Sequence, residues 1–230
     1  MKILGLQKMT LLDFPGKVAC TVFIGGCNLR CPFCHNATLV TGEDAPEPFS
    51  QEEILSYLRS RKTILDGVAV TGGEPLLYEE TLDFLKEIRA LGLAVKLDTN
   101  GCFPERLERV VRSGLADYVA MDIKNAPDAY AETTGCHSLD LTPIRQSVAF
   151  LLSGNVDYEF RTTIVAEYHT EDRIARLADW ISGARRYYLQ NFVDSGKLID
   201  ENVHGLDHSS MERLLCVARK KVPSAALRGI

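Results

Sequence analysis

Several features that would place this 230-residue chain outside the cytoplasm or on nucleic acid are missing. No apolar run approaches a membrane span, and Met1 to Gly5 lack the apolar core and cleavage site of a signal peptide. Lysine and arginine number 26 against 31 aspartate and glutamate residues, and no basic stripe suggests a nucleic-acid partner. The odd number of cysteines, 7, does not suit a secreted disulfide framework. We therefore expect a cytoplasmic protein.

The sequence also has no internal repeat, low-complexity segment or change of composition that would separate two domains. Its length suits one barrel-sized unit, and 46% hydrophobic residues can build a substantial core. We predict that residues 1–230 form a single domain.

Strand-like and helix-like segments alternate along the chain. Apolar, β-branched runs predict strands, and capped amphipathic segments predict helices. The predicted strands cover 17–24, 67–71, 94–98, 118–123, 158–164 and 186–191, and the predicted helices cover 50–61, 79–91, 104–113, 142–152, 171–181 and 209–220. This alternation predicts parallel βαβ units with right-handed crossovers. Residues 41–49 read as a loop, and residues 193–207 as a longer loop that either covers an active site or is a surface excursion.

Three cysteines lie close together in the loop after the first predicted strand. Cys27, Cys31 and Cys34 have the spacing C-x3-C-x2-C. Such thiolates can hold an iron–sulfur cluster with one iron left open, whereas four cysteines saturate the cluster of an ordinary ferredoxin. The alternative is a structural zinc site, but the paired C-x2-C halves of zinc ribbons are missing and His35 would have to fold back on Cys34.

These cysteines, with Phe33 just before the last of them, resemble the signature of the radical S-adenosylmethionine enzymes. The resemblance implies that they bind a [4Fe–4S] cluster whose open iron chelates the amino and carboxylate groups of S-adenosylmethionine. Reduction then breaks a sulfonium C–S bond and yields a 5′-deoxyadenosyl radical. Phe33 would pack against the adenine face, or serve only as a core residue beside the cluster. The fold that the family resemblance implies is an open, partial TIM-type (β/α)6 barrel of the α/β class with parallel strands.

Polar clusters follow the predicted strands, at the ends where function collects in such barrels. Gly72-Gly73-Glu74-Pro75 follows the second strand and matches the second motif of the same family. The glycines would let a ligand approach the backbone, and Glu74 would offer a carboxylate to the methionine ammonium group. Alone, this motif would indicate a tight turn.

Further oxygen-rich and basic positions lie at the ends of the third and fourth strands and inside the fifth. The resemblance implies that Asp98, Thr99 and Asp122 help to hold a monovalent cation and the cofactor carboxylate, and that Lys124 contacts the cofactor. Helix N-capping is the alternative for these aspartates and this threonine. Arg161 either binds a carboxylate in the pocket or forms a buried structural ion pair.

The other cysteines and histidines carry no metal-ligand spacing. Cys102 and Cys136 are predicted to be unliganded thiols in loops, and Cys20 and Cys216 to be core residues. The remaining histidines are predicted to be surface or loop residues: His137, His169, His204 and His208.

Leu12 to Lys17, followed by the cysteine loop and His35-Asn36, resembles the activating enzymes of glycyl radical proteins, most closely the anaerobic ribonucleoside-triphosphate reductase activating proteins. The ferredoxin insert of some activases is missing, because no cysteine lies between Asn36 and Thr71. The resemblance implies a large partner, the anaerobic ribonucleotide reductase, whose glycine loop enters the open side of the barrel. It also implies a low-potential electron donor such as flavodoxin.

Three alternatives stay open at this point. The partner could be of the pyruvate formate-lyase type, or the substrate could be a small molecule, as in 7-carboxy-7-deazaguanine synthase. A non-enzymatic electron carrier is the third, although its cluster would be fully ligated. One departure also concerns the last strand, where other activases place a histidine and this chain has Gln190.

Overall fold

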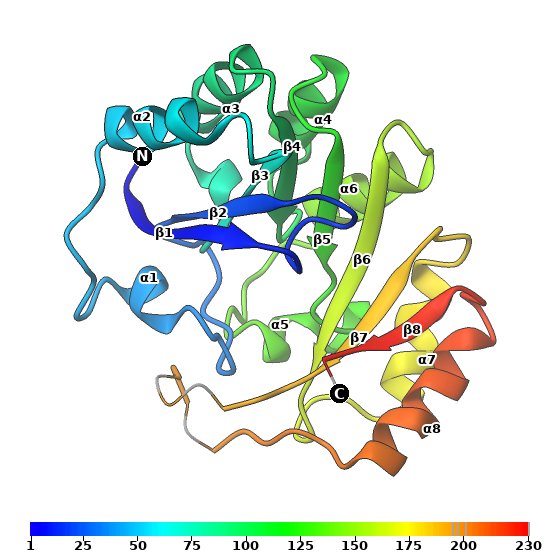
Figure 1. Ribbon diagram of the computed structural model, residues 1–230. Helices are drawn as coiled ribbons and strands as arrows, with labels where there is room; N and C mark the ends of the chain where they lie inside the picture. The colour runs from blue at the N-terminus through cyan, green and yellow to red at the C-terminus, as the bar shows by residue number, and fades with distance from the viewer. Residues whose placement is uncertain (195, 197, 201, 230) are drawn as a thin grey trace.

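The computed structural model describes residues 1–194, 196, 198–200 and 202–229. Its strands form one sheet in chain order, with helices packed against it (Figure 1). The strands are β1 (Ile3–Thr10), β2 (Ala19–Ile24), β3 (Gly67–Gly72), β4 (Ala94–Thr99), β5 (Tyr118–Asp122), β6 (Asp157–Ile164), β7 (Tyr187–Asn191) and β8 (Ala225–Arg228). β1 runs antiparallel to β2, and all later neighbours are parallel. β1 and β8 are the two edges, so the barrel is open, as predicted.

At least one helix follows each strand from β2 to β7, whereas β1 leads into β2 without a helix. The helices are α1 (Ala37–Thr41), α2 (Gln51–Arg61), α3 (Glu80–Ala90), α4 (Pro104–Arg112), α5 (Tyr130–Thr133), α6 (Thr142–Leu152), α7 (Glu171–Trp180) and α8 (His208–Arg219), with short 3₁₀ turns η1 (Pro75–Leu77) and η2 (Pro127–Ala129). α2 begins at a capping box, in which Ser50 and Glu53 each accept a hydrogen bond from the other's backbone N–H. No helix among the described residues has the length and apolarity needed to cross a membrane.

The six predicted strands are present as β2 to β7, but the sheet of the described residues also contains β1 and β8, which sequence reasoning did not predict. β1 is an edge strand with three consecutive exposed residues, so its sequence lacks the alternation that marks a half-buried strand. β8 has only four residues, Ala-Ala-Leu-Arg, which favour helix rather than strand. The residues of β1 and β8 favour a strand only weakly, so each of these edge strands depends on hydrogen bonding to its neighbour in the sheet.

The two faces of the central strands differ in chemistry. Val95 and Leu97 of β4 belong to the main hydrophobic core, whereas Lys96 and Asp98 alternate with them along the strand. β6 follows the same rule, with Phe160 in the core and Glu159 and Arg161 on the opposite face. Charged side chains therefore gather on the concave face of the open barrel.

Candidate active site

A cavity of about 410 Å³ lies within the open barrel. Eleven of the predicted site residues line it: Cys27, Cys31, Phe33, Cys34, Gly72, Gly73, Asp98, Thr99, Asp122, Lys124 and Arg161. They come from the carboxyl ends of β2 to β6, which a parallel sheet brings to one edge. The volume falls within the range of small-molecule and cofactor sites.

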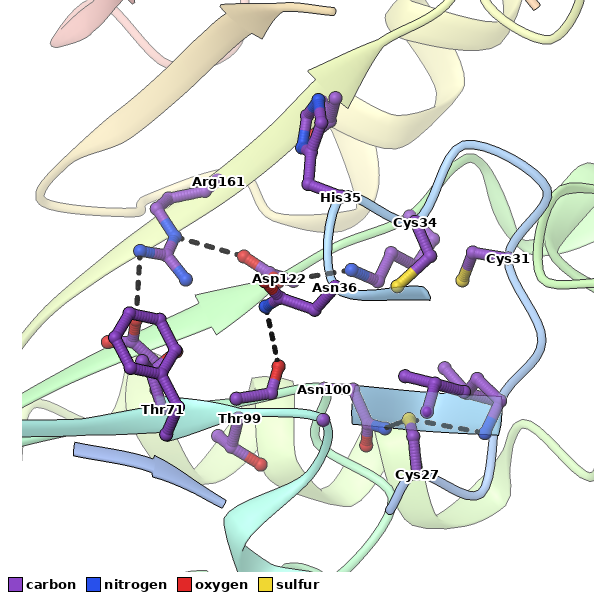
Figure 2. A pocket seen from close by; sticks show the side chains of 18 of the residues that line it. Cys27, Cys31, Cys34, His35, Asn36, Thr71, Thr99, Asn100, Asp122 and Arg161 are labelled. Carbon is purple, nitrogen blue, oxygen red and sulfur yellow. Dashed lines mark hydrogen bonds and ion pairs between the residues drawn. The ribbon is translucent and has the colours of Figure 1, made fainter. Parts of the chain in front are cut away.

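The three cysteine side chains share the loop between β2 and α1. Figure 2 shows their sulfur atoms facing one another. Burial raises the pKa of Cys27 to about 11 and that of Cys31 to about 12, and it raises the pKa of Cys34 as well. They are therefore protonated as free thiols, and a bound metal group must displace their protons. Among the described residues, no three His, Cys, Asp or Glu side chains are gathered closely enough for a single metal ion.

The residues that follow α5 contact the backbone of the cysteine loop. The amide of Arg30 donates to the carbonyl of Thr134 at 3.0 Å. Gly135 has φ +65°, and a Cβ there would lie 2.5 Å from the Arg30 carbonyl oxygen. This glycine is required both by its backbone conformation and by the close approach of the loop.

Gly72 and Gly73 lie directly against the backbone that leads into the cysteine loop. A Cβ on Gly72 would lie 2.2 Å from the Ile24 carbonyl oxygen, and one on Gly73 would lie 2.0 Å from the Gly26 carbonyl oxygen. The side-chain amide of Asn36 donates to the Gly72 carbonyl at 2.9 Å (Figure 2). The Gly-Gly pair is therefore needed to join the two motifs.

Glu74 lies behind the cavity wall. Its side chain is fully buried and does not line the cavity. The carboxylate accepts hydrogen bonds from the amides of Leu76 (2.9 Å) and Asn100 (2.6 Å) and from the Thr99 hydroxyl (2.9 Å). Burial raises the pKa of Glu74 to about 7 despite these donors. Glu74 therefore holds the end of β4, and its contact with an ammonium group stays a prediction.

Four charged side chains that line the cavity, together with the buried Lys96, form a chain of ion pairs that alternates in sign. Lys96 pairs with Asp98, and Arg161 contacts both Asp98 (3.3 Å) and Asp122 (2.9 Å), as Figure 2 shows in part. Lys124 pairs with Asp122 at 3.0 Å. Burial favours neutral aspartates, but the neighbouring cations outweigh it and lower the pKa of both Asp98 and Asp122. Arg161 therefore forms the ion pair that was one of its two predicted roles, while it also faces the cavity.

Thr99 and Phe33 are held by neighbours. The Thr99 hydroxyl bonds Glu74 and the amide of Gly101, so Thr99 does not cap α4. Phe33 is 3% exposed, with the rings of Tyr168 and His169 at 6.0 and 6.4 Å. The contact of Phe33 with an adenine ring stays a prediction.

The long loop after β7 lies on the cysteine loop, although residues 195, 197 and 201 of the predicted loop fall outside the described part. The His35 ring stacks on Phe192 at 5.2 Å, and its Nε2 lies 2.9 Å from the Val193 carbonyl oxygen. The amide of Asp200 donates to the Pro32 carbonyl at 3.0 Å. These contacts favour the prediction of a covering loop over that of a surface excursion.

Two single residues need comment, and the prediction for one of them, Cys216, was wrong. His169 lies in the loop between β6 and α7, as one of its two predicted alternatives had it, but it is buried, with 3% of its surface exposed. Its Nδ1 accepts from the Val165 amide at 3.0 Å, which leaves Nε2 to donate to the Lys124 carbonyl at 2.9 Å. Cys216 is exposed rather than buried, whereas Cys20 is in the core as predicted.

Sequence reasoning assigned no site role to other residues that line the cavity: Gln7, Asp13, Thr21, Phe23, Leu29, His35, Asn36, Val40, Thr71, Asn100 and Thr163. Gln190, noted above as the departure on the last strand, also lines the cavity. His35 and Asn36 lie in the motif that carries the activase resemblance, and Asn100 directly follows Asp98 and Thr99, so their positions were the available signal. The others lie on strands or loops whose inward face only the assembled sheet defines.

A family model for the radical SAM superfamily matches residues 21–181, which contain the cysteine loop and the strands β3 to β6. The chain belongs to the radical SAM superfamily. This membership confirms the resemblance in the cysteine spacing, and it makes the chain an enzyme whose family uses S-adenosylmethionine and a [4Fe–4S] cluster.

Several named proteins are similar to this chain in sequence or in fold. A Methanocaldococcus jannaschii protein that bears the name "putative glycyl-radical enzyme activating enzyme" is 28% identical over 98% of this chain and 95% of its own length. The pyruvate formate-lyase-activating enzyme of Clostridium pasteurianum is 35% identical over 55% of this chain and 54% of its own. Streptococcus suis SuiB, solved with S-adenosylmethionine, shares the fold with a TM-score of 0.70 over 89% of this chain and 48% of SuiB, at 16% identity.

The residues of this radical SAM chain fit the groups that the family uses. Three thiols on one loop are soft ligands suited to an iron–sulfur cluster. The adjoining cavity is lined by two cationic side chains, Lys124 and Arg161, and two carboxylates, Asp98 and Asp122, so it presents both signs of charge to a zwitterionic ligand. Cys102 and Cys136 pack against the same apolar cluster as Cys27 and Cys34, and no described residue brings either of them into a metal-ligating group.

Proposed function

We propose that this chain is an activating enzyme that forms a glycyl radical on a large partner enzyme, the anaerobic ribonucleoside-triphosphate reductase. The observation that carries the proposal is the correspondence, over 98% of this chain, with a protein that bears the name "putative glycyl-radical enzyme activating enzyme". The reductase is named as the partner because the chain as a whole resembles the reductase-activating proteins, and a pyruvate formate-lyase is the alternative partner.

The cavity residues have distinct tasks in this proposal. Cys27, Cys31 and Cys34 would hold the [4Fe–4S] cluster. When bound, the cluster and S-adenosylmethionine supply the electron and the 5′-deoxyadenosyl radical. Lys124 would orient the cofactor carboxylate. Phe33 belongs to an apolar cluster that packs around the cysteine loop and excludes water from this side.

Substrate access follows from the open barrel. β1 and β8 are the edges of the sheet, and the cavity includes Gln7 of β1 and Gln190 of β7. A glycine loop of the partner would enter between these edges and place its Cα hydrogen in the cavity. A glycine suits this role because it has no side chain, so its Cα can come close to the cavity residues.

Finer proposals accompany this function. A low-potential donor such as flavodoxin would reduce the cluster. The enzyme would act in the cytoplasm, and its residues 1–230 would form one domain.

A monovalent cation would bind near Asp98 and Asp122. Because Arg161 already pairs with both carboxylates, cation binding requires their oxygen atoms to turn from the guanidinium.

The test is anaerobic. The cluster is reconstituted and reduced, S-adenosylmethionine is added, and 5′-deoxyadenosine is measured by mass spectrometry beside an electron paramagnetic resonance spectrum. Separate arms contain the anaerobic ribonucleotide reductase or the pyruvate formate-lyase of the same genome, or neither. A glycine-centred doublet only with the reductase supports the proposal. A doublet only with the lyase reassigns the partner, and cofactor cleavage with no doublet in any arm overturns the activase function.

A further inference from the structure

Asn100 brings a side-chain amide to one of the three cysteine sulfurs. It follows β4, is 5% exposed and lines the cavity. Its Nδ2 lies 3.7 Å from Cys27 Sγ and 2.9 Å from Asn28 Oδ1. The dashed line from Asn100 to Cys27 in Figure 2 marks this contact. The side chain is therefore an N–H donor to a predicted cluster ligand.

The orientation of this amide is determined by its other bonds. The backbone N–H of Cys102 donates to Asn100 Oδ1 at 3.0 Å, and an N–H can donate only to the oxygen end of the side-chain amide. The nitrogen end must then face Cys27. The Asn100 backbone is fixed in turn, because its N–H donates to the buried carboxylate of Glu74 at 2.6 Å.

Cys27 Sγ also accepts a hydrogen bond from the Leu29 amide, at 3.4 Å. Two N–H dipoles therefore point at this sulfur, one from the backbone and one from a side chain that can be replaced. Hydrogen bonds to cluster sulfurs tune the reduction potential, because they stabilise negative charge on the sulfur. The reduced cluster carries one more electron, so these bonds favour reduction.

We propose that Asn100 is a positioning residue that raises the reduction potential of the cluster held by Cys27, with Glu74 fixing Asn100 in place. This role also accounts for the burial of Glu74 behind the site. The inference rests on membership of the radical SAM superfamily and requires no partner enzyme, so it can fail or hold independently of the activase function.

The test compares redox titrations of the reconstituted cluster in full-length variants, followed by electron paramagnetic resonance. Asn100→Leu removes the donor, and we expect the reduced-to-oxidised ratio at a fixed potential to fall about three- to tenfold. At 59 mV per tenfold this is about 30 to 60 mV more negative. Asn100→Asp should shift further in the same direction, because a carboxylate replaces the donor with a negative charge.

Asn125→Leu is the matched control. Asn125 is also a buried asparagine after a strand, but its amide donates to the Thr133 hydroxyl (2.8 Å) and the Tyr168 carbonyl (2.9 Å) rather than to a sulfur. Its loss should disturb packing at the same end of the barrel and leave the potential unchanged. An equal potential in wild type and Asn100→Leu overturns the proposal, and so does an equal shift in Asn125→Leu.

A second measurement applies if the Asn100 variants hold no cluster. Wild-type enzyme carrying asparagine labelled with ¹⁵N in the side chain only is reduced and studied by pulsed electron paramagnetic resonance. A ¹⁵N hyperfine coupling to the cluster that persists in Asn28→Asp supports the hydrogen bond, because the Asn28 side chain also lies beside Cys27 and this variant removes its nitrogen while keeping the acceptor oxygen. A spectrum with no ¹⁵N coupling overturns it. Failure of the wild-type protein to bind any [4Fe–4S] cluster would instead contradict the family's cofactor chemistry.

Discussion

Arg161 joins two acidic strand ends at the centre of the cavity wall. Its guanidinium contacts Asp98 of β4 and Asp122 of β5, and its side chain is 15% exposed. Each buried charge is compensated by a neighbour of opposite sign, so both aspartates stay ionised. Arg161 therefore holds the two carboxylates of the cavity wall together.

Replacing Arg161 with methionine should destabilise the protein strongly. The variant leaves Asp98 and Asp122 near each other with one cation fewer, and we expect the free energy of unfolding to fall by about 3 kcal/mol. Urea unfolding of the cluster-free protein under reducing conditions measures this change. Arg61→Met, at an exposed arginine of α2, is the control and should stay within 0.5 kcal/mol, roughly the range of surface substitutions. Equal stability of both variants would contradict the interpretation.

Among the elements, β8 is attached to the sheet by a buried ion pair. Arg228 contacts both carboxylate oxygens of Glu159, at 2.7 and 2.9 Å, and stacks on the ring of Tyr188 at 3.6 Å. The Tyr118 hydroxyl also donates to Glu159 at 2.8 Å. Burial raises the pKa of Glu159, but Arg228 and Tyr118 outweigh it and hold that pKa below its usual value.

Arg228→Ala should therefore destabilise the protein in a pH-dependent way. In the wild type the depressed pKa of Glu159 contributes stability that is present above its unfolded pKa of about 4.3 and is lost as pH falls. In the variant burial dominates, the pKa of Glu159 rises, and stability falls as pH rises through it. The gap between the two proteins should be about 2 kcal/mol at pH 7 and shrink towards pH 4.

Urea unfolding across this pH range measures the gap. Arg112→Ala, which removes a surface pair with Glu108, serves as the control and should show a small gap that varies little with pH. A gap for Arg228→Ala that stays constant from pH 7 to pH 4 would mean that Glu159 is not the group left unpaired.

The second element with a clear role is the segment from Phe192 to Leu206, as far as it is described. It meets the cysteine loop at His35 and Pro32, and the Ala166 amide donates to the His204 carbonyl at 2.8 Å. Phe192 and Val203 share an apolar cluster with Leu29, Cys31 and Phe33. The segment therefore covers the outer side of the cysteine loop.

His35→Ala should make a bound cluster less durable. Losing one hydrogen bond of about 1 kcal/mol would let the segment separate from the loop roughly fivefold more often. Iron release to a chelator on exposure to air should accelerate by a similar factor, measured from the cluster absorbance. His35→Phe keeps the stacked ring and should be intermediate. The exposed His137→Ala is the control, and equal rates in all variants would show that the segment does not protect the cluster.

At the scale of the whole molecule, one sheet runs without interruption from β1 to β8, so the cysteine loop and the charged wall belong to a single structure. A ligand that binds only the folded cavity should therefore stabilise the whole sheet against unfolding, by mass action. That residues 1–230 form a single domain stays a prediction.

S-adenosylmethionine should stabilise the cluster-loaded protein, because its binding requires the folded cavity. At a concentration of 100 Kd the gain is about 2.7 kcal/mol, or roughly 5 to 10 °C in Tm for a chain of this size. Anaerobic thermal unfolding measures it. Cys31→Ala should lose both the cluster absorbance and this stabilisation while its cluster-free form folds normally. Cys216→Ala, at an exposed cysteine, should retain both. Equal stabilisation of Cys31→Ala would mean that the cofactor binds without the cluster.

Much of the fold was open to prediction from local patterns. α6 begins and ends at the predicted residues, and the capping box starts α2 where Ser50 and Glu53 placed it. The three cysteines and the polar residues after each strand identified the cavity, because parallel strands bring their carboxyl ends to one edge. Covalent spacing and hydrophobic periodicity are local quantities, and a sequence states them directly.

The tertiary structure alone decided which of these residues face the cavity and which support it. It turned Glu74 inward to hold Asn100, gave Arg161 two carboxylate partners from other strands, and placed Asp13 and Thr21 on the cavity wall. It also added β1 and β8, whose own residues favour a strand only weakly. These outcomes depend on distances between side chains far apart in the chain, and such distances are set by the packing of the assembled sheet rather than by local sequence.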